Sequence, residues 1–487
     1  MLKNIILKYH QMPVQVRASL WFLVCSFLQR GISVIVAPIF TRLLTPQEYG
    51  QYSYFNSWLD IISVFVTLRL YYGVFVQGLV KYEDDRNRYS SSMQGLELVL
   101  CLFWTAVYLA FREFWNNLLK LTTVQMLAML VMIWAAGAFR FWLSEQRVLY
   151  KYKMVVILTL MASLLKPFLG ILFVLNAEDK VTARILGITL TELIIYGTTF
   201  TVQMMRGKQF YSAKYWKHAL LFNIPLIPHY LAQTVLNAAD KIMIRDMVGA
   251  GAAGIYAIAY SISKIMILFN NALNHTLTPW YYQKIKAGRA DIIASIAYPS
   301  LIGIAVINLI LIAFAPEIIK FFAPKPYYDA IWIIPPIAMS VFFTFGYNLF
   351  ACFEFYFEKT KFIMVASVFA AFLNVLLNYI CIQRFGYYAA GYTTLICYAM
   401  YTLSHYYFMN KLCKIYLPNV KVYNKKVLAS ITCIFLSCGF LFLLSYNSII
   451  MRCCLIVLFL LVLLMFRHSI HNFINKVIGV RKNKHAL

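Results

Sequence analysis

The chain has 487 residues, of which 62% are apolar, and its mean hydropathy is +0.70. Soluble globular domains are about 45–50% apolar, so the composition excludes an ordinary soluble protein. The formal net charge of +26 is compatible with nucleic-acid binding. However, the lysines and arginines cluster in short segments between apolar stretches, which is typical of membrane topology signals, and we expect no nucleic-acid partner.

The first apolar run covers residues 18–40 and follows three basic residues, Lys3, Lys8 and Arg17. This run is longer than the apolar core of a cleavable signal peptide, which has about 7–15 residues. We therefore expect it to be the first membrane span.

Thirteen further apolar stretches follow, each long enough for a helix of about 20 residues to cross a bilayer. Runs of this length exclude a membrane β-barrel, so the predicted fold is an all-α polytopic membrane protein with about 14 transmembrane helices. The predicted spans are 18–40, 54–80, 91–111, 122–143, 154–175, 183–205, 219–239, 250–273, 293–315, 331–353, 362–382, 387–409, 427–446 and 450–467.

The basic residues between the spans predict the orientation. If the N-terminus is cytosolic, and residues at the ends of spans are counted with the adjoining segments, 28 of the 44 lysines and arginines fall on the cytosolic side, 11 on the opposite side and five in the middle of spans. This bias follows the positive-inside rule and predicts that both termini are cytosolic.

Two similar motifs indicate an internal repeat. After the first span, Arg42 precedes a Gly-Gln-Tyr triplet at 50–52, and after the seventh, Arg245 precedes a Gly-Ile-Tyr triplet at 254–256. Six spans separate the copies, so both copies have the same orientation, which predicts a parallel repeat.

This repeat predicts three parts. Residues 1–217 form an N-terminal lobe of six helices, and residues 218–410 form a C-terminal lobe of six helices. Residues 411–487 add two helices and a basic cytosolic tail.

Polar stripes mark the helices that we expect to line a cavity. A polar stripe on a membrane helix must face protein or water, because lipid offers it no hydrogen-bond partner. The strongest stripes lie on the equivalent spans 1, 2, 7 and 8, which predicts a central cavity between the lobes. Their members are Ser26, Arg30 and Ser33; Asn56, Asp60, Ser63 and Thr67; His229, Gln233, Asn237 and Asp240; and Tyr256, Tyr260, Lys264, Asn271 and His275.

Cations exceed acids within the spans. The cations are Arg30, Arg69, Arg140, Lys166 and Lys264, and the acids are Asp60, Glu97 and Glu192. A site for organic cations or Na⁺ would favour carboxylates, whereas this excess fits an anion such as a diphosphate or an acidic sugar. We expect Arg30 and Lys264 to hold it from opposite lobes.

Other charged residues leave alternatives open. Arg69 lies opposite the Asp60 stripe and either pairs with another helix or faces a second wall of the cavity. Lys166 either contributes to the cavity or forms a structural ion pair with Glu192. Arg140 is expected to reach the cytosolic interface. Five residues are candidates for ion coupling or for the polar cavity lining, namely Asp60, Glu192, His229, Asn237 and Asp240.

No catalytic pattern is present in the sequence. The ten cysteines and eight histidines lack metal-ligand spacing, and there is no phosphate-binding loop, GxSxG or HExxH motif. We therefore expect a transporter without cofactor or metal, driven by an ion gradient or by removal of its product.

Several motifs together resemble one transporter family. They are Arg30 with Pro38, residues 42–53 (RLLTPQEYGQYS), residues 223–228 (NIPLIP), residues 237–244 (NAADKIMI) and the triplet at 254–256. On these residues the chain resembles the bacterial oligosaccharide flippases, the O-antigen and polysaccharide exporters of the multidrug/oligosaccharidyl-lipid/polysaccharide superfamily.

This resemblance implies two six-helix lobes in a V that opens alternately to each side of the bacterial cytoplasmic membrane. It implies transfer of an undecaprenyl-diphosphate-linked oligosaccharide to the outer leaflet, and polymerase and chain-length regulator proteins as partners. Arg30 matches a cavity arginine of the family.

Three alternatives remain. An O-antigen polymerase or polytopic glycosyltransferase would need a sizeable outside loop, and the longest predicted one covers only residues 315–330. A multidrug antiporter shares the architecture but conflicts with the excess of cations. A lipid II flippase is chemically closer and stays open.

Overall fold

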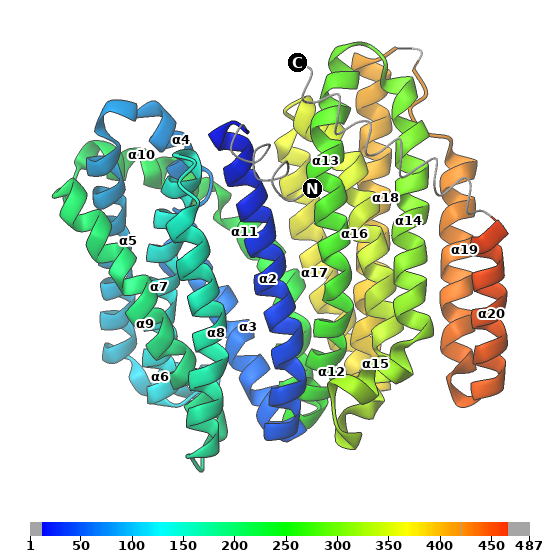
Figure 1. Cartoon of the computed structure of the whole chain (residues 1–487), viewed down its shortest axis with the longest axis horizontal. Helices are drawn as coiled ribbons and strands as arrows, with labels where there is room; N and C mark the ends of the chain where they lie inside the picture. The colour runs from blue at the N-terminus through cyan, green and yellow to red at the C-terminus, as the bar shows by residue number, and fades with distance from the viewer. Residues whose placement is uncertain (1–11, 419, 466–487) are drawn as a thin grey trace, which may run out of the picture. The chain divides into compact units, whose positions relative to one another are not determined.

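The computed structural model describes residues 12–418 and 420–465, which form helices joined by short turns (Figure 1). The chain divides into two compact units, unit 1 (Met1–Ala238) and unit 2 (Ala239–Leu487). The predicted boundaries at 217/218 and 410/411 stay predictions.

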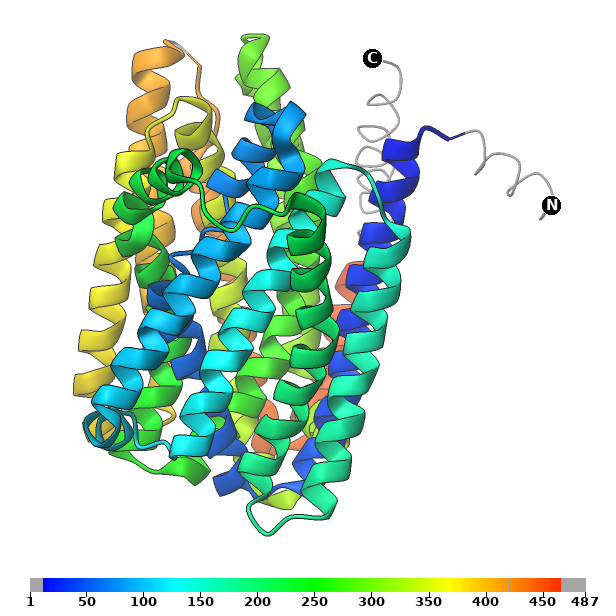
Figure 2. The same cartoon turned by 90° about the vertical axis from the view of Figure 1, so that its left-hand side faces the viewer.

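Unit 1 contains the long helices of the first half of the chain, which run close to parallel (Figure 2). Its elements are α2 (Val14–Leu43), α3 (Pro46–Thr67), α4 (Val74–Lys81), η1 (Glu83–Asp85), α5 (Arg86–Ala110), α6 (Arg112–Leu119), α7 (Thr123–Val148), α8 (Lys153–Leu175), α9 (Lys180–Gly207), α10 (Ala213–Asn223), η2 (Ile224–Leu226) and the first part of α11 (Ile227–Met247). Figure 1 shows α4 and α10 at one end of this unit and α6 at the other.

Unit 2 contains the remaining helices. They are the end of α11, α12 (Ala250–Ser263), η3 (Lys264–Met266), α13 (Ile267–Lys286), η4 (Ala290–Ile293), α14 (Ala294–Ala313), α15 (Ala315–Phe322), η5 (Lys325–Trp332), α16 (Ile334–Tyr356), α17 (Thr360–Phe385), α18 (Ala389–Tyr416), α19 (Lys425–Leu444), η6 (Ser445–Asn447) and α20 (Ile449–Met465). The predicted outside loop at 315–330 is folded into α15 and η5.

The all-α polytopic fold is confirmed. Among the described residues, 11 helices are long and apolar enough to cross a membrane. The other three predicted spans overlap helices only in part: 54–80 overlaps α3 and α4, 387–409 overlaps α18, and 450–467 overlaps α20, with residues 466 and 467 outside the described residues. Two of these, α3 and α18, carry many polar side chains, and the apolar part of α20, Ile449–Val462, is short.

Local sequence explains where helices begin. Thr45 and Glu48 form a reciprocal cap at the start of α3, in which the Glu48 N–H donates to Thr45 Oγ1 at 3.3 Å and the Thr45 N–H donates to Glu48 Oε2 at 2.7 Å. Pro46 occupies the first helical position, where its missing N–H costs nothing. The Thr-Pro-Gln-Glu part of the 42–53 motif is therefore a helix-start signal.

Corresponding helices pack in the same pairs in the two units. In unit 1, α5 packs on α7, α7 on α9, and α8 on α9. In unit 2, α14 packs on α16, α16 on α18, and α17 on α18, and these are the third to sixth spans of the second half. The short helices α6 and α15 also follow equivalent spans. This correspondence supports the parallel repeat.

Glycines let helices of unit 1 approach closely. A Cβ at Gly187 would lie 2.9 Å from the backbone of Leu169 and Gly170 in α8, and a Cβ at Gly207 would overlap Ser91 in α5. Such contacts are typical of membrane helices, since lipid supplies no hydrophobic force between them.

Candidate functional site: a broken helix and a cationic pocket

The second predicted span is broken in its middle. We expected a continuous helix over 54–80, but α3 ends at Thr67 and α4 begins at Val74, so this expectation was wrong. Leu68 and Arg69 at the break have φ angles of 48° and 53°. This left-handed conformation costs roughly 1–2 kcal/mol for a residue other than glycine, so other contacts must hold it.

Two side chains from the seventh span hold the break. Asn223 Nδ2 donates to the Leu68 carbonyl at 2.8 Å, and Arg69 Nη2 donates to Thr234 Oγ1 at 3.2 Å. Asn223 is fully buried and is the first residue of the 223–228 motif. Of the two alternatives for Arg69, the structure therefore shows pairing with another helix.

Replacing Asn223 by alanine should lower the free energy of unfolding by about 1–3 kcal/mol, because the Leu68 carbonyl loses its buried donor. Thermal unfolding of the detergent-purified protein measures this. Asn117→Ala, at an exposed position of α6, is the matched control. Equal unfolding temperatures for both variants would contradict the role assigned to Asn223.

The eighth span changes from α-helix to a short 3-10 turn in its middle, and a predicted cation lies at this turn. α12 ends at Ser263, a 3-10 turn covers Lys264–Met266, and α13 begins at Ile267. Lys264 Nζ lies 4.5 Å from the centre of the Tyr260 ring, and Lys241 Nζ lies 4.9 Å from the same ring. Arg69 thus lies where the second span is interrupted, and Lys264 lies at a 3-10 turn within the equivalent eighth span. Interrupted helices often form transporter substrate sites.

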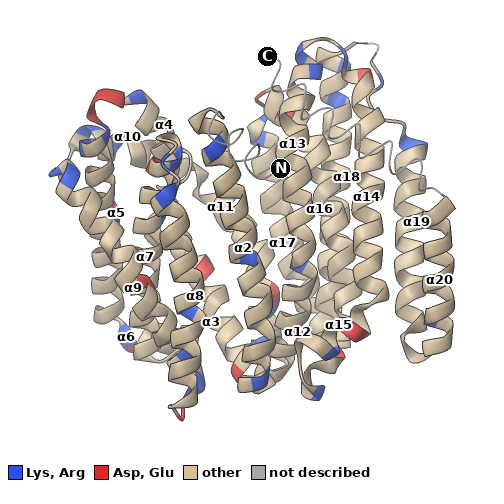
Figure 3. Cartoon of the chain, viewed as in Figure 1, with Lys and Arg blue, Asp and Glu red and all other residues tan. Residues whose placement is uncertain are grey.

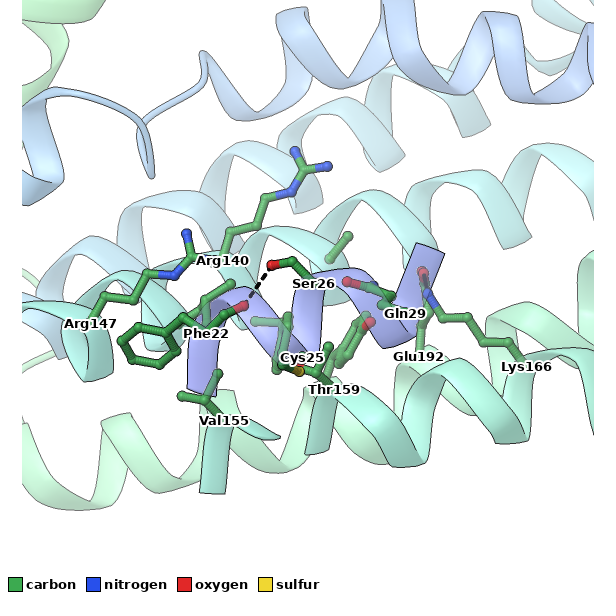
Figure 4. A pocket seen from close by; sticks show the side chains of 14 residues that line it. Phe22, Cys25, Ser26, Gln29, Arg140, Arg147, Val155, Thr159, Lys166 and Glu192 are labelled. Carbon is green, nitrogen blue, oxygen red and sulfur yellow. Dashed lines mark hydrogen bonds and ion pairs between the residues drawn. The ribbon is translucent and has the colours of Figure 1, made fainter. Parts of the chain in front are cut away.

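A pocket of about 280 Å³ lies within unit 1, between α2, α7, α8 and α9 (Figure 4). Figure 4 shows Arg147 at one end and the side chains of Lys166 and Glu192 at the other. Its polar lining includes Ser26, Gln29, Arg140, Arg147, Thr159, Lys166, Glu192 and Tyr196. With three cations and one acid, this lining favours an anion.

Lys166 and Glu192 form the ion pair that we considered from sequence. Lys166 Nζ lies 2.5 Å from Glu192 Oε1 and 4.9 Å from the centre of the Tyr196 ring. The Lys166 side chain is 28% exposed and that of Glu192 is 8% exposed. The pair therefore both stabilises unit 1 and belongs to the pocket wall.

Lys166→Ala should lower the free energy of unfolding by up to about 3 kcal/mol, because the buried Glu192 carboxylate would lose its counter-ion. The charge swap Lys166→Glu with Glu192→Lys should recover much of this loss. Unfolding temperatures measure both, with Lys153→Ala at the exposed start of α8 as control. A swap as unstable as the single variant would show that the pair itself contributes little.

The sequence interpretation missed two pocket residues. We expected Arg140 to reach the interface, but its guanidinium hydrogen-bonds to the Tyr71 hydroxyl and lies 4.7 Å from the centre of that ring. Arg147 lies seven residues further along α7 and 5.8 Å from the Phe22 ring. The available signal was their spacing, because residues seven apart share a helix face.

Asp240 lies at the centre of a buried network in unit 2. Its Oδ2 accepts from the Tyr256 hydroxyl at 2.6 Å and from Thr394 Oγ1 at 2.8 Å. Its Oδ1 accepts from Asn378 Nδ2 at 2.6 Å, and Thr393 donates to Asn378. Protein donors thus occupy both oxygens, which favours a structural role.

The other predicted residues are more dispersed. Arg30 is exposed on α2 and makes no hydrogen bond or ion pair with any described residue, and Asp60 is exposed on α3. His229 is half-buried beside Tyr230, and Asn237 Nδ2 donates to the Gln233 carbonyl at 2.7 Å. Arg30 and Lys264 belong to different units, so their joint action stays a prediction.

Charge is concentrated at helix ends, with few charged residues along the helices (Figure 3). Within the described ranges, no three His, Cys, Asp or Glu residues are grouped so that they could hold a metal ion.

Comparison with known proteins agrees with this architecture. Residues 16–284 match the family described as polysaccharide biosynthesis protein, and residues 225–380 match the MatE family. The Lsg locus protein 1 of Haemophilus influenzae is 22% identical over 383 residues, which cover 73% of this chain and 88% of that protein.

Two solved structures share the fold. A multidrug resistance MATE family transporter of the MOP superfamily, in an inward-facing conformation, has a TM-score of 0.63 at 12% identity, covering 81% of this chain and 96% of its own. The lipid II flippase MurJ, in an inward closed conformation, has a TM-score of 0.63 at 14% identity, and the match covers 92% of this chain and 99% of MurJ.

The fold therefore defines a multi-pass membrane protein with the architecture of MOP-superfamily transporters. The match over more than half of the chain shows that it belongs to the polysaccharide biosynthesis protein family.

Proposed function

We propose that this protein is a flippase that moves undecaprenyl-diphosphate-linked oligosaccharide repeat units across the bacterial cytoplasmic membrane. The product would supply surface polysaccharide, such as O-antigen, capsule or exopolysaccharide. The observation that carries the proposal is the excess of cations within the apolar helices, in the pocket of unit 1, at the break of the second span and at the 3-10 turn of the eighth.

The charges fit the chemistry of such a substrate. A diphosphate needs cationic or hydrogen-bonding partners inside the membrane, and the planar guanidinium of arginine binds phosphate oxygens in pairs. Ser26, Gln29 and Thr159 add neutral polar groups suited to sugar hydroxyls. The polyprenyl tail would stay in lipid, because it needs no polar partner.

Transport would proceed by alternating access. Six-helix lobes that move as bodies expose a site first to one side and then to the other. In this scheme Arg30 and Lys264 hold the diphosphate or an acidic sugar, and polymerase and chain-length regulator proteins receive the product. In this scheme both termini, which lie outside the described residues, are cytosolic.

Gene deletion tests the proposal. Loss of surface glycan, with complete lipid-linked repeat units trapped on the cytosolic leaflet, is the expected result. Loss of long chains with single units still exported would instead indicate a polymerase. Unchanged glycan would contradict the proposal and favour the multidrug antiporter.

A lipid II flippase is the second candidate, favoured by the MurJ likeness over 92% of this chain. Expression of this protein in cells depleted of their own lipid II flippase separates the two functions. Restored growth would establish lipid II transport and would overturn a restriction to surface glycan precursors.

A further inference from the structure

A carboxyl group in the interior of unit 1 has no hydrogen-bond partner among the described residues. Glu97 on α5 is fully buried, and no hydrogen-bond donor in the described part of the chain reaches either of its oxygens. Its neighbour Gln94 is bonded instead to the Ala138 carbonyl at 3.0 Å and to Gln203 Oε1 at 2.6 Å. An ionised carboxylate in this position would be costly, because neither water nor a donor compensates its charge.

The neighbouring helix leaves a slot for this carboxyl. A Cβ at Gly137 on α7 would overlap Glu97 Oε1 and would lie 2.8 Å from Oε2. The absence of a side chain at Gly137 therefore allows the carboxyl to lie against the α7 backbone, so Glu97 is accommodated in the packing.

One cation lies within electrostatic reach. Arg140, three residues after Gly137 and therefore on the same face of α7, acts on the Glu97 charge. It does not hydrogen-bond to Glu97 in this conformation, and its Nη1 donates instead to the Tyr71 hydroxyl. The same Arg140 also lines the pocket, so its charge is shared between the buried carboxyl and the anion site.

The other titratable groups near Glu97 are either bonded to other residues or carry no positive charge. Cys101 lies one turn along α5, Glu145 on α7 bonds to Gln203 of α9, and Glu192 pairs with Lys166. At one end of α5, Tyr215 of α10 bonds to Asp85. Arg140 is the cation among these groups that acts on Glu97.

We propose that Glu97 is a proton-binding site that controls whether Arg140 is available to an anion in the pocket. Protonated Glu97 needs no counter-ion, so Arg140 is available to bind an anion in the pocket. When Glu97 releases its proton to solvent, the Arg140 guanidinium breaks its hydrogen bond to the Tyr71 hydroxyl and pairs with the Glu97 carboxylate. The anion in the pocket then loses Arg140 as a partner. Proton binding and anion binding then strengthen each other, because such linkage is reciprocal.

This inference rests on the proposed function only for the identity of the physiological anion. The linkage itself can be measured with sulfate, whose charge is constant over the acid-to-neutral range. Calorimetry of sulfate binding to the purified full-length protein should show affinity falling by about fivefold to 150-fold as pH rises. Buffers of different ionisation enthalpy should show uptake of a proton with each sulfate.

Glu97→Gln keeps the shape of the side chain and cannot ionise. It should bind sulfate with the same affinity at every pH and without proton uptake, while Glu113→Gln, at the exposed start of α6 and outside the pocket, should keep the proton uptake. Arg140→Gln should weaken sulfate binding at low pH to the level of the wild type at high pH. Unfolding temperatures identify any variant that fails to fold.

The proposal is overturned if Glu97→Gln keeps the pH dependence and proton uptake of the wild type, or if sulfate binding to the wild type does not depend on pH. Either result would leave the deletion experiment unaffected, since that experiment measures glycan. Conversely, a deletion strain with normal glycan would contradict the flippase function without removing a measured linkage between proton and sulfate.

Discussion

Alanine at Arg30 or at Lys264 is expected to abolish surface glycan while leaving the amount of protein in the membrane unchanged. Arg30 is exposed on α2 and Lys264 is partly exposed in the 3-10 turn of the eighth span, so neither substitution removes a packed core side chain. Each would remove a cation that we assign to the diphosphate or acidic sugar. Analysis of surface glycan, with immunoblotting of the membrane fraction, measures the two effects separately.

Controls distinguish charge from general damage. Arg112→Ala removes an arginine from the exposed start of α6 and should leave the glycan normal. Arg30→Lys should restore only part of the activity, because lysine keeps the charge but not the planar pair of donors. Normal glycan in both alanine variants would refute the assignment of these two residues.

Asp240→Ala is expected to cause the largest loss of stability in unit 2. It leaves the Tyr256 hydroxyl, Thr394 hydroxyl and Asn378 amide without their acceptor in a fully buried place. Each unsatisfied buried donor costs about 1–3 kcal/mol, so the total reaches several kcal/mol. Thermal unfolding in detergent should show a clear decrease in the transition temperature.

Two comparisons sharpen this prediction. Asp240→Asn keeps one carbonyl oxygen as acceptor and should lose less stability than alanine. Asp291→Ala removes an exposed acid of the same unit and should unfold like the wild type. If Asp240→Ala also unfolded like the wild type, the network would not be a determinant of stability, and a functional role for Asp240 would gain weight.

Long apolar runs allowed the helices to be predicted well, because crossing a bilayer demands about 20 apolar residues in sequence. The break at 68–73 could not be predicted in the same way. Neither Leu68 nor Arg69 is of a residue type that disfavours a helix. The break depends on contacts with Asn223 and Thr234, which lie 155 and 165 residues away along the chain. Contacts this distant leave no local periodicity to detect.

The site was only partly predictable for a related reason. A lysine and a glutamate inside spans each need a partner, which is why pairing of Lys166 with Glu192 could be considered in advance. Arg140 was assigned to the interface from its place near a helix end. The actual partner, Tyr71, belongs to the unpredicted break, so an error in the fold produced an error in the site.

The close approaches at Gly137, Gly187 and Gly207 have a consequence for how this family can diverge. At these positions the neighbour is a backbone or a buried side chain, so even one added methyl group meets an atom that cannot easily move. The lipid-facing leucines and phenylalanines, by contrast, can be exchanged for any apolar residue. A saturation mutagenesis map of unit 1 should therefore show its least tolerant positions at the smallest residues, and relatives at 22% identity would keep the interhelical spacing while exchanging most of the apolar surface.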